Sequence, residues 1–489
     1  MPISSRVTNH GPHLTRIPAQ RNNLRNSAMG VLAGLSKLIN ALAPINQLPP
    51  EILGVVPMYH QEGRTCKELV TVSGVCSYWR STFLATPSIW TRLDGRGVEK
   101  TQAWVRRSGV LPIQLIAETS PDPRVLEFLA PHFSRLVVVG LACLTTRDQY
   151  PITHHHLTEL LRPNRRLRII QIKAPIRGTI DTPVVMDGKF ASLERLLIVG
   201  IQISFTNLRA RNLRHAHIAG TFDPTSLLDF LEASPLLESL SLKLDPPQDM
   251  LVRTRRKVVL GKMKSLRFFY HGLEILQHLS LPPGGDVKSM EAISADQLDG
   301  ATSGNAQLLS RAFDNLPVSR QADSLSFHIT GVSCTASLKG PNGTLELVTR
   351  KTNIRTAYVT LLRLFAQNSF GSIRDLEISN LELSPRDFQL ASDFVRLLDG
   401  LQSIVMHRTS ASPWLLALGS SHCPQLRNLT FEYPSPWSVD YDAFSRFAKD
   451  RYEAGIPIQR LAVVNRPEVL LDAARVEGLR KYVSCVVWT

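Results

Sequence analysis

Three consecutive histidines, His154, His155 and His156, are the residues of this sequence that most resemble a site for chemistry. A zinc site combines histidine with thiolate or carboxylate ligands, and the near candidate in the sequence is Glu159. Adjacent histidines point in different directions, so the cluster fits a solvated loop better than a metal site.

Common catalytic and nucleotide-binding motifs are absent from the sequence. It contains no G-x-S-x-G, no G-x-x-x-x-G-K-[ST] and no H-E-x-x-H. Its six cysteines are far apart, without a C-x-x-C pair, which indicates reduced intracellular thiols rather than a zinc site or a disulfide framework. We therefore expect no enzymatic activity and no cofactor.

A stretch near the N-terminus, residues 45–94, carries the most specific pattern. Pro49 and Pro50 suit the first turn of a helix, and Leu48 precedes that helix as an anchor. The spacing of Ile52, Leu53 and Val56 gives this helix one apolar face. A second helix is predicted from an apolar stripe formed by Leu69, Val72, Val75, Cys76 and Trp79.

Three motifs of this stretch together resemble an F-box: LPPEIL at 48–53, VCSYWR at 75–80 and TPSIW at 86–90. The resemblance implies binding to a Skp-type adaptor and, through it, to a cullin. The residues that match the adaptor-facing positions of the family are Leu48, Pro49, Ile52, Leu53, Val75, Cys76, Trp79 and Arg80. Pro57 departs from the pattern and predicts that the first helix ends or kinks near Val56. The alternative is an ordinary helical cap on a larger fold.

Beyond residue 94 a pattern of the type L-x-x-L-x-L recurs, with Leu, Ile, Val or Phe at the apolar positions. Examples are Leu193–Ile198, Leu237–Leu242 and Leu426–Phe431, each preceded by a helix-like run. The spacing resembles leucine-rich repeats. The expected fold class is therefore α+β with repeats: a small helical F-box module followed by an irregular leucine-rich-repeat-like solenoid. An ordinary α/β domain remains the alternative, because βα alternation also places apolar strands after helices.

Two further segments of residues 95–489 have recognisable patterns. Residues 324–350 alternate apolar and polar side chains around glycine turns, which predicts antiparallel hairpins inserted into the repeats. Residues 284–303 are polar and are expected to form a loop. At the end of the chain we expect a helix over 469–478 and a last strand over 482–488.

The N-terminal segment, residues 1–44, is basic and becomes apolar toward its end. We expect its first part to be disordered and its last part to form an amphipathic helix that packs beside the helices of 45–94. The apolar face would consist of Leu32, Leu35, Leu38, Ile39 and Leu42. An organelle import signal is the alternative, because such signals are also amphipathic, rich in Arg and Ser and poor in acids.

The net charge of +15 raises the possibility of nucleic-acid binding. Basic residues concentrate in the first fifty residues and in 253–267, but neither segment interleaves the aromatic side chains that a base-stacking surface uses. An acidic protein partner fits this charge equally well. No stretch reaches eighteen uninterrupted apolar residues, so no transmembrane helix is expected, and the expected location is cytoplasmic or nuclear.

These patterns lead to a functional hypothesis: the chain resembles the divergent F-box proteins of mushroom-type fungi and would be the substrate-recognition subunit of a cullin ubiquitin ligase. An unknown target protein would bind the strands or loops of 95–489, and Arg195, Glu238, Arg374 and Arg427 are candidate contacts. The alternatives are an F-box scaffold without ubiquitin transfer and a basic nucleic-acid-associated factor.

Overall fold

A computed structural model describes most of the chain. The described residues are 16–59, 71, 73–142, 154–173, 183–244, 256–270, 273–276, 278–282, 290–291, 321–330, 333–341, 343–350, 362, 365, 372–381, 388–419, 422–432, 441–464 and 473–488. The chain divides into two compact units, Met1–Ala117 and Glu118–Thr489.

The first unit contains helices and one pair of short strands. The parallel pair β1–β2 follows the helices of residues 45–94, so this unit is not purely helical. In chain order its elements are α1 (Arg16–Leu42), η1 (Pro44–Gln47), α2 (Pro50–Tyr59), α4 (Ser77–Leu84), η2 (Pro87–Thr91), β1 (Arg92–Leu93), α5 (Val98–Arg107) and β2 (Ile113–Ala117).

Both helix predictions for residues 45–94 need correction. Helix α2 continues through Pro57 and ends at Tyr59, so the expected end near Val56 is wrong. Because the helix stops two residues after Pro57, the lost backbone hydrogen bond falls near its end rather than in its interior. Helix α4 begins only at Ser77: Cys76 is its extended N-cap residue and Val75 precedes it. Leu69 and Val72 lie outside the described residues.

The amphipathic helix predicted before residue 45 is present as α1, but its apolar face does not pack as expected. Its side chains remain 52% to 76% exposed at Leu32, Leu35, Leu38, Ile39 and Leu42. An amphipathic pattern predicts which face is apolar, but not that another element will cover that face.

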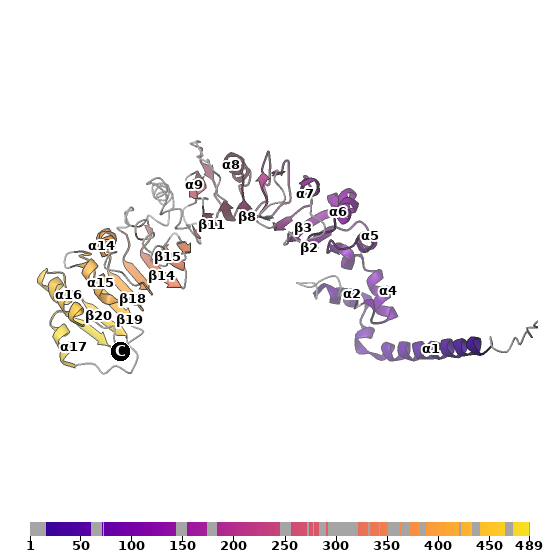
Figure 1. Cartoon of the computed structure of the whole chain (residues 1–489), viewed down its shortest axis with the longest axis horizontal. Helices are drawn as coiled ribbons and strands as arrows, with labels where there is room; N and C mark the ends of the chain where they lie inside the picture. The colour runs from indigo at the N-terminus through magenta and orange to yellow at the C-terminus, as the bar shows by residue number, and fades with distance from the viewer. Residues whose placement is uncertain are drawn as a thin grey trace, which may run out of the picture. The chain divides into compact units, whose positions relative to one another are not determined.

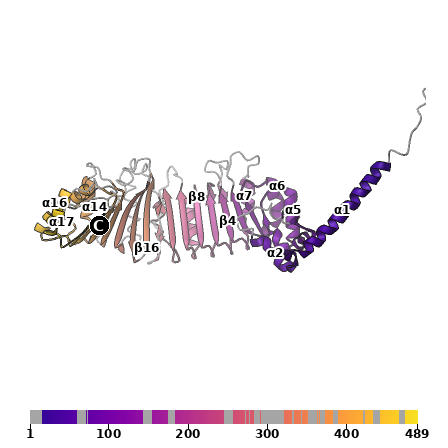
Figure 2. The ribbon, with the colours of Figure 1, turned by 90° about the horizontal axis from the view of Figure 1, so that it is seen from below.

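The first part of the second unit is a parallel sheet. Strands β3, β4, β6, β8, β9 and β11 follow one another as hydrogen-bonded neighbours, and all of these pairings are parallel. Figure 2 shows them side by side, and in Figure 1 the helices α6 to α9 lie along one side of them. The elements are α6 (Pro123–Leu129), η3 (Ala130–Arg135), β3 (Leu136–Ala142), α7 (His154–Leu160), β4 (Ile169–Lys173), β5 (Val184–Val185), β6 (Arg195–Val199), β7 (Ile203–Ser204), β8 (His215–Gly220), α8 (Pro224–Glu232), β9 (Ser239–Leu244), β10 (Val258–Val259), β11 (Ser265–Tyr270), α9 (Leu273–Leu276) and β12 (Leu279–Ser280).

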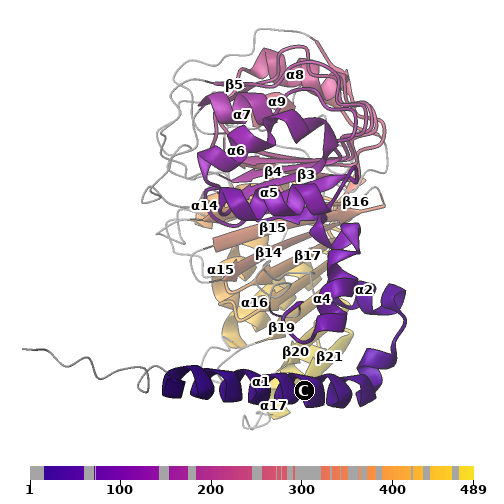
Figure 3. The same cartoon turned by 90° about the vertical axis from the view of Figure 1, so that its right-hand side faces the viewer.

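The second part of this unit is a nine-stranded sheet with the order β13-β16-β15-β14-β17-β18-β19-β20-β21. Strands β14 to β16 pair antiparallel, whereas β14 and β17 to β21 pair in parallel. Figure 3 shows the last strands, β20 and β21, beside each other. The elements are β13 (Met290–Glu291), β14 (Ser324–Thr330), β15 (Ser333–Gly340), β16 (Gly343–Arg350), β17 (Asp375–Ser379), α14 (Phe388–Arg396), β18 (Ser403–His407), α15 (Ala411–Leu418), β19 (Asn428–Glu432), α16 (Tyr441–Glu453), β20 (Arg460–Val464), α17 (Ala473–Arg480) and β21 (Cys485–Trp488).

The expected fold class is wrong. Instead of a small helical module and a leucine-rich-repeat-like solenoid, the chain has a mixed α/β fold with two large sheets made mostly of parallel strands. The recurring apolar positions that suggested repeats also arise from βα alternation, because each parallel strand buries one face against helices. The antiparallel hairpins of 324–350 do form, but they are part of the nine-stranded sheet rather than an insertion, since β14 pairs directly with β17.

The end of the chain is close to expectation. Helix α17 covers Ala473–Arg480 and the final strand covers Cys485–Trp488. Only Met290 and Glu291 of the predicted loop 284–303 are described, and they form β13.

The core of the second unit consists of alternate strand residues and helix residues. In β6, for example, Leu196 and Ile198 are buried while Arg195 is exposed. Helix α8 begins at Pro224 after Asp223, whose side chain caps it by accepting a hydrogen bond from the Ser226 backbone N–H at 2.7 Å. The alternation leaves one face of the parallel strands opposite the apolar core.

Candidate functional site

Three side-chain hydrogen bonds hold residues 45–94 together. The hydroxyl of Tyr78 donates to the carbonyl of Leu48 at 2.9 Å, and the Trp79 indole N–H donates to the side-chain oxygen of Asn46. The Trp90 indole N–H donates to the carbonyl of Phe83 at 2.9 Å. The segment before α2 is thereby tied to α4, and α4 is tied to η2.

A close approach joins α2 to the residue that precedes η2. A Cβ built on Gly54 would lie 3.1 Å from the Thr86 hydroxyl oxygen, so the glycine allows the helix to come this near. The buried side chains of Leu53, Phe83 and Trp90 complete a small core.

The eight expected adaptor-binding residues divide according to burial. Leu53 is fully buried and Trp79 is 7% exposed, so both belong to the core rather than to the surface. Leu48 and Cys76 are half-buried. The exposed members are Pro49, Ile52, Val75 and Arg80.

Three exposed apolar side chains in the same stretch were not singled out from the sequence. Ile45, Val55 and Leu84 are 45%, 40% and 44% exposed, comparable to Ile52 at 53% and Val75 at 56%. Helical spacing could not identify them, because they lie off the stripes that form the core. These exposed side chains come from η1, from α2, and from α4 with the residue before its N-cap.

The four candidate target contacts do not lie together. Arg195 is exposed at the start of β6, and Arg374 and Arg427 are exposed immediately before β17 and β19. Glu238, before β9, is bound on both sides: its carboxylate accepts hydrogen bonds from Arg214 Nη1 at 2.8 Å and Lys264 Nζ at 2.7 Å.

Glu238 belongs to a row of alternating charges across five neighbouring strands. Arg168 and Glu194 form a two-bond pair at 2.9 Å, followed along the sheet by Arg214, Glu238 and Lys264. The Arg168 hydrogen bonds lower the pKa of Glu194, and the Lys264 hydrogen bond lowers that of Glu238. We call these five residues the charge ladder.

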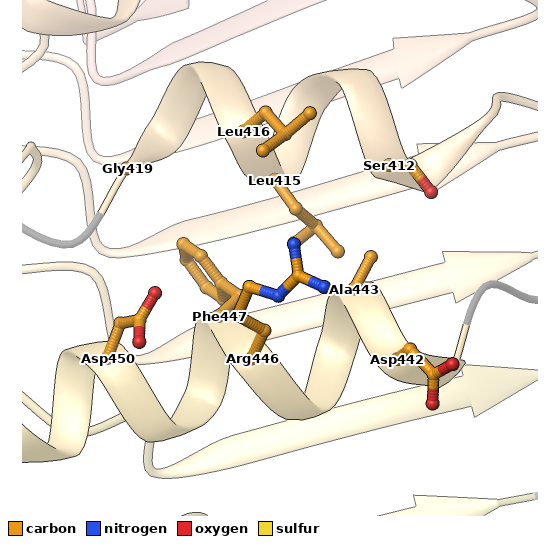
Figure 4. A pocket seen from close by; sticks show the side chains of 9 residues that line it. All are labelled: Ser412, Leu415, Leu416, Gly419, Asp442, Ala443, Arg446, Phe447 and Asp450. Carbon is orange, nitrogen blue, oxygen red and sulfur yellow. The ribbon is translucent and has the colours of Figure 1, made fainter.

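A pocket lies between α15 and α16 (Figure 4). Leu415, Leu416 and Phe447 supply its apolar lining, and Arg446 extends from α16 toward Leu415. Its volume of about 190 Å³ is below the range of roughly 300–1,000 Å³ that is usual for small-molecule sites. This pocket does not indicate a substrate site.

The histidine cluster lies in a helix and not in the expected loop. His154, His155 and His156 lie in the first turn of α7, where His154 Nε2 is 3.0 Å from the carbonyl of Pro183. Within the described part of the chain, no group of three or more His, Cys, Asp or Glu is placed to hold a metal ion. The four described cysteines, Cys76, Cys334, Cys423 and Cys485, are free thiols.

Comparisons with known proteins do not place the chain in a family. No protein-family model matches it, and no curated protein is significantly similar to it. None of the helices among the described residues is both long enough and apolar enough to cross a membrane.

Proposed function

We propose that the chain is the substrate-recognition subunit of a cullin ubiquitin ligase and that residues 45–94 bind a Skp-type adaptor. The observation that carries the proposal is the exposure of apolar side chains at motif positions, above all Ile52 and Val75. A residue that only stabilised the fold would be buried, as Leu53 and Trp79 are.

The proposed surface also contains Ile45, Val55 and Leu84 from the same stretch. Removing such apolar area from water is the usual driving force of protein association, and a few central residues normally carry most of the affinity. The hydrogen bonds from Tyr78 and Trp79 hold the segment before α2 in place, so this segment loses little conformational freedom on binding.

In this role the chain makes and breaks no bonds. It holds a target near a conjugating enzyme, which converts a bimolecular encounter into an effectively intramolecular one. The target would bind to the second unit, which contains the large sheets.

The test measures binding of the purified full chain to a recombinant Skp-type adaptor by calorimetry. Because Ile52 and Val75 are exposed, Ile52→Asp and Val75→Asp should leave the fold intact, and each should weaken binding by about thirtyfold, the equivalent of roughly 2 kcal/mol. The matched control is Val110→Asp, which places the same charge at an 87% exposed valine of the first unit outside residues 45–94.

Unchanged binding by both variants, or an equal loss with Val110→Asp, would contradict the assignment. Addition of a cullin separates the ligase from a scaffold without ubiquitin transfer. A complex of chain, adaptor and cullin supports the ligase, whereas a complex that excludes the cullin contradicts it.

A further inference from the structure

The face of β4, β6, β8, β9 and β11 opposite the apolar core residues of these strands has an unusual composition. The strand register aligns His217, Ser241 and Arg267 on three adjacent strands. Two residues further along the strands, a second row of paired residues runs from Lys173 across Val199 and Ala219 to Lys243. We call this surface the open face.

Distances along a sheet bring these side chains within reach of one another. Neighbouring strands are about 4.8 Å apart, so His217, Ser241 and Arg267 occupy consecutive steps. Lys173 and Lys243 are three steps apart, about 14 Å between backbones, and both carry long side chains. Val199 and Ala219, both uncharged, lie between them.

The charge of the open face has one sign. Four cationic residues lie on it in these strands, namely Lys173, Arg195, Lys243 and Arg267, and no open-face position of the described strands is acidic. The nearby carboxylates of Glu194 and Glu238 are paired in the charge ladder instead. Burial, and then the charges of Lys173, Arg267 and Lys243, lower the pKa of His217. The ring therefore lies in a positive local field.

Ser241 provides the second and independent observation. Its side chain is 8% exposed, and its hydroxyl oxygen has no hydrogen-bond partner among the described residues. A buried hydroxyl without a partner is costly, and native proteins usually satisfy such groups with a ligand, water or another side chain. Its position between His217 and Arg267 places this free donor at the centre of the basic residues.

We propose that the open face binds an acidic segment of a partner protein, with one oxyanion held by Ser241, His217 and Arg267 and flanked by Lys173 and Lys243. Arginine and hydroxyl donors together recognise phosphate and carboxylate oxygens. That the partner is a ligase target rests on the proposed function, whereas the oxyanion site does not.

A short acidic segment fits this surface better than a nucleic acid does. The corresponding face of the nine-stranded sheet, in the same unit, carries charges of both signs: the carboxylates of Glu346, Asp375, Glu377 and Glu432, and the cations of Lys339 and Arg460. A long polyanion would meet these carboxylates. A segment that presents one or two anionic groups need contact only the basic strands.

The test uses the full chain without adaptor, so its result is independent of adaptor binding. Immobilised degenerate peptides with a central phosphoserine are compared with the same peptides carrying serine, with peptides carrying two central aspartates, and with a single-stranded oligonucleotide. We expect retention on phosphoserine or aspartate peptides and none on serine peptides. A preference for the phosphoserine peptides or for the aspartate peptides shows whether a phosphate or a carboxylate supplies the oxyanion.

Variants locate the site. Arg267→Gln and Ser241→Ala should each weaken peptide binding by about tenfold, the equivalent of one charge-assisted hydrogen bond. The control Arg460→Gln removes the same charge from an exposed position of β20. Ser241→Ala is also informative for stability, because removing an unpartnered hydroxyl should not destabilise the fold.

Several outcomes would overturn the proposal. They are equal retention on serine peptides, retention on the oligonucleotide alone, or an equal loss with Arg460→Gln. A loss of stability in Ser241→Ala would show that its hydroxyl serves the fold and not a ligand.

Discussion

Arg451 of α16 is a charged side chain with no solvent exposure. Its Nη1 donates to the carbonyl of His422 at 2.8 Å, and its Nη2 to those of Cys423 and Leu426 at 3.1 and 3.4 Å. Burial lowers its pKa. Cys423 has a positive φ of 50°, which is unusual outside glycine, so the arginine holds a strained turn before β19.

Replacing Arg451 should therefore destabilise the chain. Arg451→Met removes the donor to the carbonyls of His422 and Leu426 and leaves that of Cys423 with the Leu426 N–H alone. It should lower the free energy of unfolding by about 3 kcal/mol, measured by urea denaturation at pH 7. Arg446→Met, at an exposed position of the same helix, should change it by less than about 0.5 kcal/mol. Similar losses in the two variants would show that Arg451 does not hold the turn.

At the scale of elements, the charge ladder links the starts of five neighbouring strands. Its carboxylates have lowered pKa values because they accept hydrogen bonds from Arg168 and Lys264. A carboxylate with a lowered pKa in the folded state stabilises the fold above its unfolded pKa. That stabilisation is lost as the pH falls through the lowered value.

The charge ladder therefore predicts a pH-dependent difference in stability toward urea between the wild type and the double variant Glu194→Gln, Glu238→Gln. The variant should unfold at a lower urea concentration at pH 7, and the two proteins should converge below the folded pKa values, because the wild-type carboxylates are then protonated. Since these groups are near the surface, 1 M salt should also reduce the difference at pH 7. If the difference in urea midpoint is independent of both pH and salt, the charge ladder stabilises the fold through packing alone.

At the scale of the whole molecule, the nine-stranded sheet connects segments that are distant in the sequence. Cys334 lies on β15 and Cys423 just before β19, and burial raises the pKa of each thiol to about 12. Both should therefore react slowly with alkylating reagents in the folded chain, whereas the exposed Cys485 should react fast.

Thiol labelling during unfolding can test whether the sheet behaves as one unit. If it unfolds cooperatively, Cys334 and Cys423 should become reactive at the same urea concentration, as measured by mass spectrometry of each peptide after pulse alkylation. Separate midpoints would show that the antiparallel and parallel halves unfold independently. Cys485 serves as the internal control for reagent activity.

Much of the local structure could be predicted from the sequence. The helix beginning at Pro50, the apolar phase of β6 and the hairpins of 324–350 all follow from short-range spacing and turn residues. The fold class was wrong for the same reason, because the short-range pattern of a strand after a helix is common to several architectures.

The sequence by itself determined which side of each element is apolar, because the side-chain periods of helices and strands depend only on backbone geometry. Only the tertiary structure decided which residues meet. Parallel pairing brought His217, Ser241 and Arg267 together. The packing of helices enclosed Arg451 of α16 and left Ile52 of α2 exposed beside the buried Leu53. Register between parallel strands is set by long crossover connections and by packing across the sheet, and neither can be read from the spacing within one strand.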